Sequence, residues 1–168
     1  MKLSYLAAVP VAFVAIAALS PSSGADRKLD ALRFFEGKTE SIATIKLVMK
    51  KPYKSRSIGR GEIKPDGSLN LVQRVEEEGK PVHDRRWHIR EVEPGKFTGT
   101  MTEAKGPVTI DEINGRYRFR FKMKGNISVE QWVTPLPGGK TASTKVTIRK
   151  MGITVGSSEG TIRKVADN

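Results

Sequence analysis

The chain has 168 residues, and its 38% of hydrophobic residues suffices for the core of one domain and is too high for a disordered chain. It has no cysteine, which excludes disulfides, thiolate metal sites, a cysteine nucleophile and a lipid attached through an N-terminal cysteine. Its 30 Lys and Arg outnumber its 18 Asp and Glu, a net charge of +12 that attracts nucleic acid, anionic lipid headgroups and acidic polymers alike.

The first 25 residues have the three parts of a secretory signal peptide. Lys2 is followed by an uncharged apolar run over residues 6–19, and small side chains at Ser23 and Ala25 suit a signal peptidase. The alternative is an uncleaved anchor, but the run is shorter than the roughly 20 residues that span a bilayer. We therefore expect cleavage after Ala25, export to the periplasm or beyond, and a single domain over residues 26–168.

The exported part is predicted to begin with a short helical turn and to continue as strands. Leu29 and Leu32 can share a helical face in a turn that ends at Gly37. Beyond it, apolar residues alternate with polar ones and turn sequences recur at short intervals. Strands are expected near residues 40–48, 57–64, 69–77, 82–92, 96–102, 107–113, 116–124, 127–134, 142–150 and 158–165.

The segment 116–124 alternates most clearly, and it follows Asn114-Gly115, a strong signal for a two-residue hairpin turn. Such a turn pairs Ile110 with Phe119, Val108 with Phe121, and Asp111 with Arg118. Apolar residues then meet on one face and opposite charges on the other, so the turn and the alternation support each other.

The short connections favour an antiparallel up-and-down meander of eight to ten strands. Closing the meander removes the exposed sheet edges, so we expect an all-β, closed or nearly closed lipocalin-like barrel. One hairpin does not fit a regular register. A two-residue turn at Pro94-Gly95 would put His88 opposite Met101 and mix the two faces, which predicts a bulge or a longer loop there.

Several short motifs, taken in order, resemble an exported bacterial family, the domain of unknown function 3833 family. They are 32–37 (LRFFEG), 86–89 (RWHI), 95–99 (GKFTG) with Gly106, and 150–156 (KMGITVG). The resemblance implies a small lipocalin-like fold on the outer side of the inner membrane, and no catalytic residues. Members of this family are often lipoproteins and often occur near genes for fatty-acid modification. This chain departs from the lipoprotein pattern because it lacks cysteine.

Two sets of residues are candidates for a binding site. An apolar row could line a cavity, or it could form a filled core as in many small barrels. A basic row on the opposite face could bind phosphate or carboxylate groups, or it could be a solvated strand face. The apolar row comprises Trp87, Tyr117, Phe119, Phe121 and Met123, and the basic row comprises Arg116, Arg118, Arg120, Lys122 and Lys124.

Other site types lack the residues that they need. His83 and His88 are the only histidines, and they point to opposite faces of an extended strand, so they cannot chelate one metal ion. No nucleophile elbow or Ser–His pair is recognisable. We therefore predict no metal, no cofactor and no catalytic residues. Export and a core role for the aromatic residues argue against a nucleic-acid partner.

Three functions remain open, and oligomeric state is not predicted. The first is an exported binding protein that takes a fatty-acyl or other amphiphilic ligand inside its barrel. The second is an interaction protein whose basic surface docks on an anionic membrane or envelope polymer. The third is a small enzyme of lipid modification.

Overall fold

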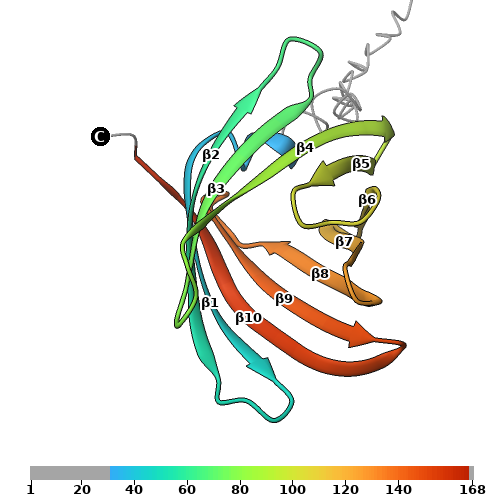
Figure 1. Ribbon diagram of the computed structural model, residues 1–168. Helices are drawn as coiled ribbons and strands as arrows, with labels where there is room; N and C mark the ends of the chain where they lie inside the picture. The colour runs from blue at the N-terminus through green and yellow to red at the C-terminus, as the bar shows by residue number, and fades with distance from the viewer. Residues whose placement is uncertain (1–30, 167–168) are drawn as a thin grey trace, which may run out of the picture.

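The computed structural model describes residues 31–166, and this part of the chain forms a closed antiparallel barrel of ten strands. Each strand pairs with its neighbours in sequence, and the first strand pairs with the last (Figure 1). This confirms the all-β meander and its closure. The strands are β1 (Gly37–Leu47), β2 (Tyr53–Ile63), β3 (Leu69–Glu77), β4 (His83–Glu93), β5 (Lys96–Met101), β6 (Val108–Ile113), β7 (Arg116–Met123), β8 (Ile127–Pro135), β9 (Thr141–Lys150) and β10 (Ile153–Val165).

The β6–β7 hairpin has the register that the Asn114-Gly115 turn predicts. Both turn residues have positive φ values, 53° and 73°, as a two-residue turn of this kind requires. Ile110 lies opposite Phe119 and Asp111 lies opposite Arg118. A local turn sequence therefore set which face of β7 turns inward.

The β4–β5 hairpin contains the predicted irregularity. Glu93 pairs with Lys96 across the turn, but the register shifts between Glu91 and Glu93. As a result Trp87, rather than His88, lies opposite Met101. The bulge keeps the apolar residues of both strands on the inside of the barrel.

Closure joins β1 to β10 along ten residue pairs, from Lys38–Val165 to Leu47–Gly156. On the outer face of this seam the Glu40 side chain is only 7% exposed, because two arginines cover it. Arg56 Nε donates to Glu40 Oε1 at 2.8 Å, and Arg163 Nε donates to Oε2 at 2.8 Å. Glu40 thus ties β2 and β10 to the strand between them.

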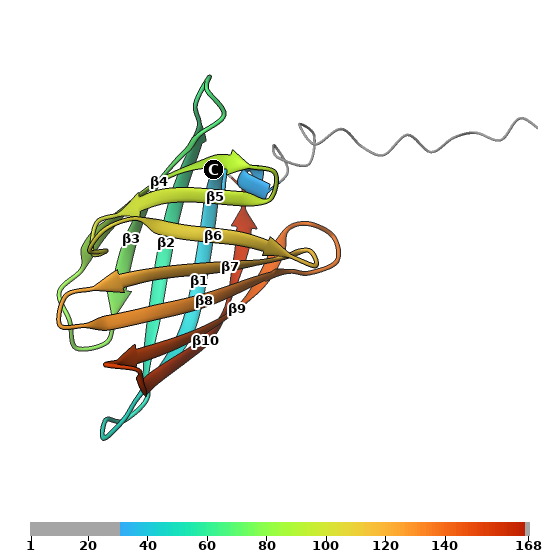
Figure 2. The same cartoon turned by 90° about the vertical axis from the view of Figure 1, so that its right-hand side faces the viewer.

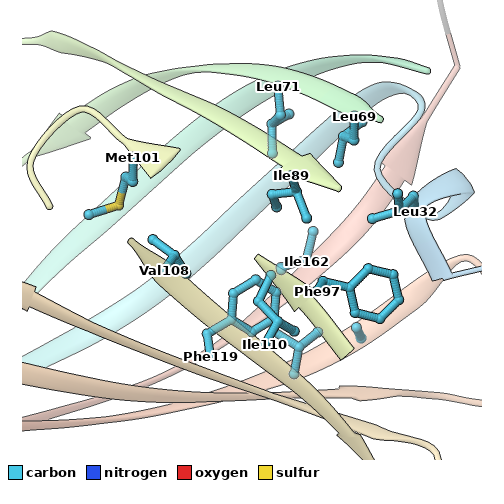
Figure 3. Packing of buried hydrophobic residues seen from close by; sticks show 12 residues of the cluster. Leu32, Leu69, Leu71, Ile89, Phe97, Met101, Val108, Ile110, Phe119 and Ile162 are labelled. Carbon is cyan, nitrogen blue, oxygen red and sulfur yellow. The ribbon is translucent and has the colours of Figure 1, made fainter. Parts of the chain in front are cut away.

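The N-terminal turn closes one end of the barrel. Residues 31–33 are helical, and the amide of Phe35 donates to the carbonyl of Leu32 at 3.0 Å, as expected for a short helical turn. Leu32 reaches into the barrel toward Leu69 and Phe97 (Figure 3). The strand beneath carries Gly61, where a Cβ would lie 1.9 Å from the Phe35 carbonyl oxygen, so only glycine fits this approach.

The predicted signal peptide, its cleavage site after Ala25 and Leu29 of the helical turn lie outside the described residues. No helix in the described part of the chain is long and apolar enough to cross a membrane.

Candidate functional site: an apolar cavity inside the barrel

The barrel is hollow over part of its length and encloses a cavity of about 390 Å³. Most of its lining is apolar. Successive side chains along each strand point alternately inward and outward, and the inward positions are mostly apolar whereas the outward ones are often charged. The apolar lining residues are Phe35, Ala43, Ile45, Leu47, Leu71, Val75, Trp87, Ile89, Met101, Phe119, Phe121, Met123, Ile127, Val129, Val133, Val146, Ile148 and Ile162.

The cavity extends to the end of the barrel opposite the N-terminal turn. Leu47, Glu77, Met101 and Met123 are the last residues of β1, β3, β5 and β7, and all four line the cavity. We call this end the mouth; its turns are residues 48–52, 78–82, 102–107, 124–126 and 151–152. Figure 2 shows these turns on the side away from the N-terminal helical turn.

Four of the five residues of the predicted apolar row line this cavity. Trp87 lies at the centre of the group, with its ring edge-on to Phe119 and Phe121 at centroid distances of 6.3 and 6.1 Å. Met123 lies nearer the mouth, at the end of β7. Tyr117 lies apart from the lining, toward the closed end, where its ring packs edge-on against Phe97.

A small set of polar side chains also faces the cavity, and sequence reasoning missed all of it. Gln73 Oε1 accepts a 2.7 Å hydrogen bond from Trp87 Nε1, which satisfies the indole and holds its ring in place. The signal was present in the alternation of β3, because Gln73 lies two residues from Leu71 and from Val75. The polar uncharged members of the lining are Ser41, Ser55, Ser57, Gln73, Gln131, Thr144 and Ser158.

Two ion pairs stand at the inner rim of the mouth. Arg85 lies in the lining, and its Nε donates to both oxygens of Glu103, at 2.9 and 3.1 Å. Lys80 donates to Glu77 and, at 3.1 Å, to the hydroxyl of Tyr53. Partial burial disfavours charged Lys80, but the hydrogen bonds to Glu77 and Tyr53 outweigh this and raise the pKa of Lys80. Charged side chains of both signs therefore line the rim.

The predicted basic row lies on the outer wall of the barrel, along β7 and just beyond it. Arg118 and Arg120 both reach Asp111 Oδ2, at 3.2 and 2.9 Å, so one acid partly neutralises two bases. Arg116 lies over the ring of Trp132, 4.4 Å from its centroid. Lys122 and Lys124, the remaining members, are exposed.

The two histidines have separate partners. His83 Nε2 lies 3.2 Å from Glu103, and His88 Nδ1 lies 2.7 Å from the amide oxygen of Asn70 on the outer face. Among residues 31–166, no group of three or more His, Asp or Glu side chains is placed to hold a metal ion.

No known family model and no curated protein matches the chain. Several solved structures do. The S-type phycobiliprotein lyase CPES from Guillardia theta superposes with a TM-score of 0.66 at 8% identity, covering 83% of this chain and 93% of the lyase. Rv2717c from M. tuberculosis superposes with a TM-score of 0.60 at 12% identity, and the match covers 83% of this chain and 98% of the Rv2717c chain.

A protein of unknown function from the DUF3598 family of Nostoc punctiforme superposes with a TM-score of 0.59 at 9% identity. The match covers 79% of this chain and 48% of that protein. At such identities these likenesses show the lipocalin-like barrel fold alone. The resemblance to the domain of unknown function 3833 family therefore stays a prediction.

Proposed function

We propose that this protein is an exported binding protein that holds the acyl chain of a fatty acid or a similar amphiphile in its barrel. The observation that carries the proposal is the cavity: about 390 Å³, mostly apolar, and closed at one end by Leu32 and its neighbours. This volume falls within the roughly 300–1,000 Å³ of small-molecule sites. Export by residues 1–25 and membership of the domain of unknown function 3833 family belong to the same proposal.

The lining favours a chain with a polar head over a compact polar ligand. Water inside an apolar cavity finds few hydrogen-bond partners, whereas each methylene group buried there contributes about 0.8 kcal/mol to binding. The charged groups at the rim, Lys80 and Arg85, would then lie beside the headgroup. Both bases already have carboxylate partners, so the rim carries charges of both signs. It should therefore accept a headgroup of either charge rather than select the carboxylate of a free fatty acid.

The two tryptophans of the chain provide a direct test, because Trp87 lines the cavity and Trp132 lies on the outer wall under Arg116. A fatty acid brominated on its chain quenches an indole that it touches. In the W132F variant, where Trp87 is the only reporter, we expect saturable quenching. In the matched W87F variant, where Trp132 remains, we expect none.

Quenching of neither tryptophan, or equal quenching of both, would overturn the proposal. Lipids extracted from the purified protein and identified by mass spectrometry add an independent measurement. A stoichiometric acyl lipid is the expected result.

A further inference from the structure

Two methionines project into solvent at adjacent turns of the mouth. Met49, in the β1–β2 turn, is 98% exposed, and Met151, in the β9–β10 turn, is 77% exposed. Val48, which precedes Met49, and Ile153, two residues after Met151, are also well exposed. We refer to Val48, Met49, Met151 and Ile153 as the tip patch.

The two turns of the tip patch belong to neighbouring strands, because β1 and β10 are paired up to the mouth. Leu47 lies opposite Gly156, and the amide of Val48 donates to the carbonyl of Val155 at 2.9 Å. Both turns project from the same end of the barrel (Figure 2). The four apolar side chains therefore belong to one side of the mouth.

The backbone at both methionines is unfavourable for methionine. Met49 and Met151 have φ values of 61° and 50°, in the left-handed region that disfavours side chains other than those of Gly, Asn and Asp. Among the described residues, the other non-glycine residues with positive φ are Asn114 and Asn126. Met151-Gly152 thus occupies a turn like that of Asn114-Gly115, with methionine where asparagine is preferred. Because both methionine side chains are exposed, packing within the domain does not explain the choice of methionine here. The choice points to a contact that the two side chains make outside the domain.

The charge around the tip patch has one sign. Segments 41–61 and 131–158, which include both turns, contain no acidic residue. Lys50, Lys51 and Lys150 flank the two methionines and are exposed. The acids of the mouth lie on other strands, at residues 76–78 beside the β3–β4 turn and at Glu103 in the β5–β6 turn.

From these observations we infer that the protein docks on an anionic lipid bilayer through the tip patch. Apolar side chains ringed by lysines suit the boundary between headgroups and acyl chains, where the methionines enter and the lysines meet the phosphates. The acidic β3–β4 side would be repelled by the same surface. Docking does not depend on the proposed ligand. Only the passage of an acyl ligand between the bilayer and the cavity through the mouth rests on the proposed function.

Sedimentation with vesicles tests the docking. The purified protein should bind vesicles of phosphatidylcholine mixed with phosphatidylglycerol, bind pure phosphatidylcholine far less, and bind less as salt rises. The M49N/M151N variant should lose about tenfold or more in affinity while its melting temperature stays equal or rises, because asparagine suits a positive φ. The control V92N/L136N, which removes two exposed apolar side chains near the opposite end, should bind like the wild type.

Charge reversal supplies the second arm. K50E/K51E should weaken binding about tenfold or more, whereas R90E/K140E, with the same change in net charge nearer the closed end, should weaken it much less. Equal losses in both, or equal binding by M49N/M151N and its control, would overturn the docking. Ligand binding separates the two proposals: M49N/M151N should still take up a brominated fatty acid from solution. Loss of Trp87 quenching with vesicle binding intact would contradict the proposed function alone.

Discussion

Gln73 and Trp87 are diagonal neighbours across the β3–β4 pair inside the barrel, and Trp87 Nε1 donates a 2.7 Å hydrogen bond to Gln73 Oε1. This bond lets a large aromatic ring line an apolar cavity without leaving its N–H unsatisfied. The ring is thereby held against Phe119 and Phe121. The relationship makes Trp87 a fixed wall of the cavity rather than a mobile side chain.

The Q73L variant should lower the free energy of unfolding by about 1–2 kcal/mol, because it strands the indole N–H in an apolar site. In the W87F background the indole N–H is absent. Q73L should therefore lower the free energy of unfolding less in W87F than it does in the wild type. Urea denaturation of the four proteins measures the coupling. Strictly additive losses would show that the hydrogen bond does not contribute to stability.

The inner and outer faces of β7 should respond differently to aspartate. F119D places a carboxylate at a side chain that is 7% exposed, and should cost at least about 3 kcal/mol and unfold the domain. R118D should stay folded and lower the free energy of unfolding by about 1 kcal/mol. The new acid lies opposite Asp111, but Arg120 still binds Asp111. Similar thermal stability of the two variants would contradict the assignment of the faces.

Glu40 should make the barrel seam sensitive to acid. Hydrogen bonds from Arg163 and then from Arg56 hold the pKa of Glu40 below its usual value of 4.5. A lowered pKa in the folded state means that the stabilisation is present above about pH 4.5 and is lost as the pH falls through the folded-state pKa. The difference in melting temperature between the wild type and E40Q should therefore be larger at pH 7 than at pH 3. A difference that is the same at both would refute this role.

Filling the cavity should remove the ligand without damaging the fold. Val146 lines the cavity, so V146F should weaken binding of a brominated fatty acid by about tenfold, or ~1.4 kcal/mol. V72F makes the same change on the outer face and should bind like the wild type. Binding to the wild type should change little with salt, because acyl burial depends on apolar area. Unchanged binding by V146F would place the ligand elsewhere.

The mature protein should begin at Asp26, because Ser23 and Ala25 suit the signal peptidase behind the apolar run. N-terminal sequencing of the protein from the periplasmic fraction measures this. Intact Met1 in the membrane fraction would instead indicate a retained anchor.

Much of the fold was accessible from local patterns. All ten predicted strands occur within residues 31–166, and β3 was predicted with its observed bounds, 69–77. The largest error lies at the start of β10, which begins at Ile153 rather than near 158. Glycines at 156 and 160 weaken the strand pattern there. Close neighbours explain them: a Cβ at Gly156 would lie 2.5 Å from the side chain of Leu47, and such approaches between strands leave no local signal.

The candidate site was accessible only in part. Alternation placed Trp87, Phe119, Phe121 and Met123 on inward faces, but it could not separate Tyr117, which packs in the filled end. It also left the choice between a filled core and a cavity open. The volume left inside depends on how side chains from every strand meet, and no single strand carries that information.

By itself, the sequence determined the class of the fold, the hairpin at Asn114-Gly115 and the inward face of β7, because alternation and turn residues act between neighbours along the chain. Only the tertiary structure decided the register in which β1 pairs with β10, the contact of Glu40 with Arg163 across 123 positions, and the presence of a cavity in the barrel. It also decided that Met49 and Met151 share one side of the mouth. These features depend on contacts between residues that lie far apart in sequence, which local periodicity cannot encode.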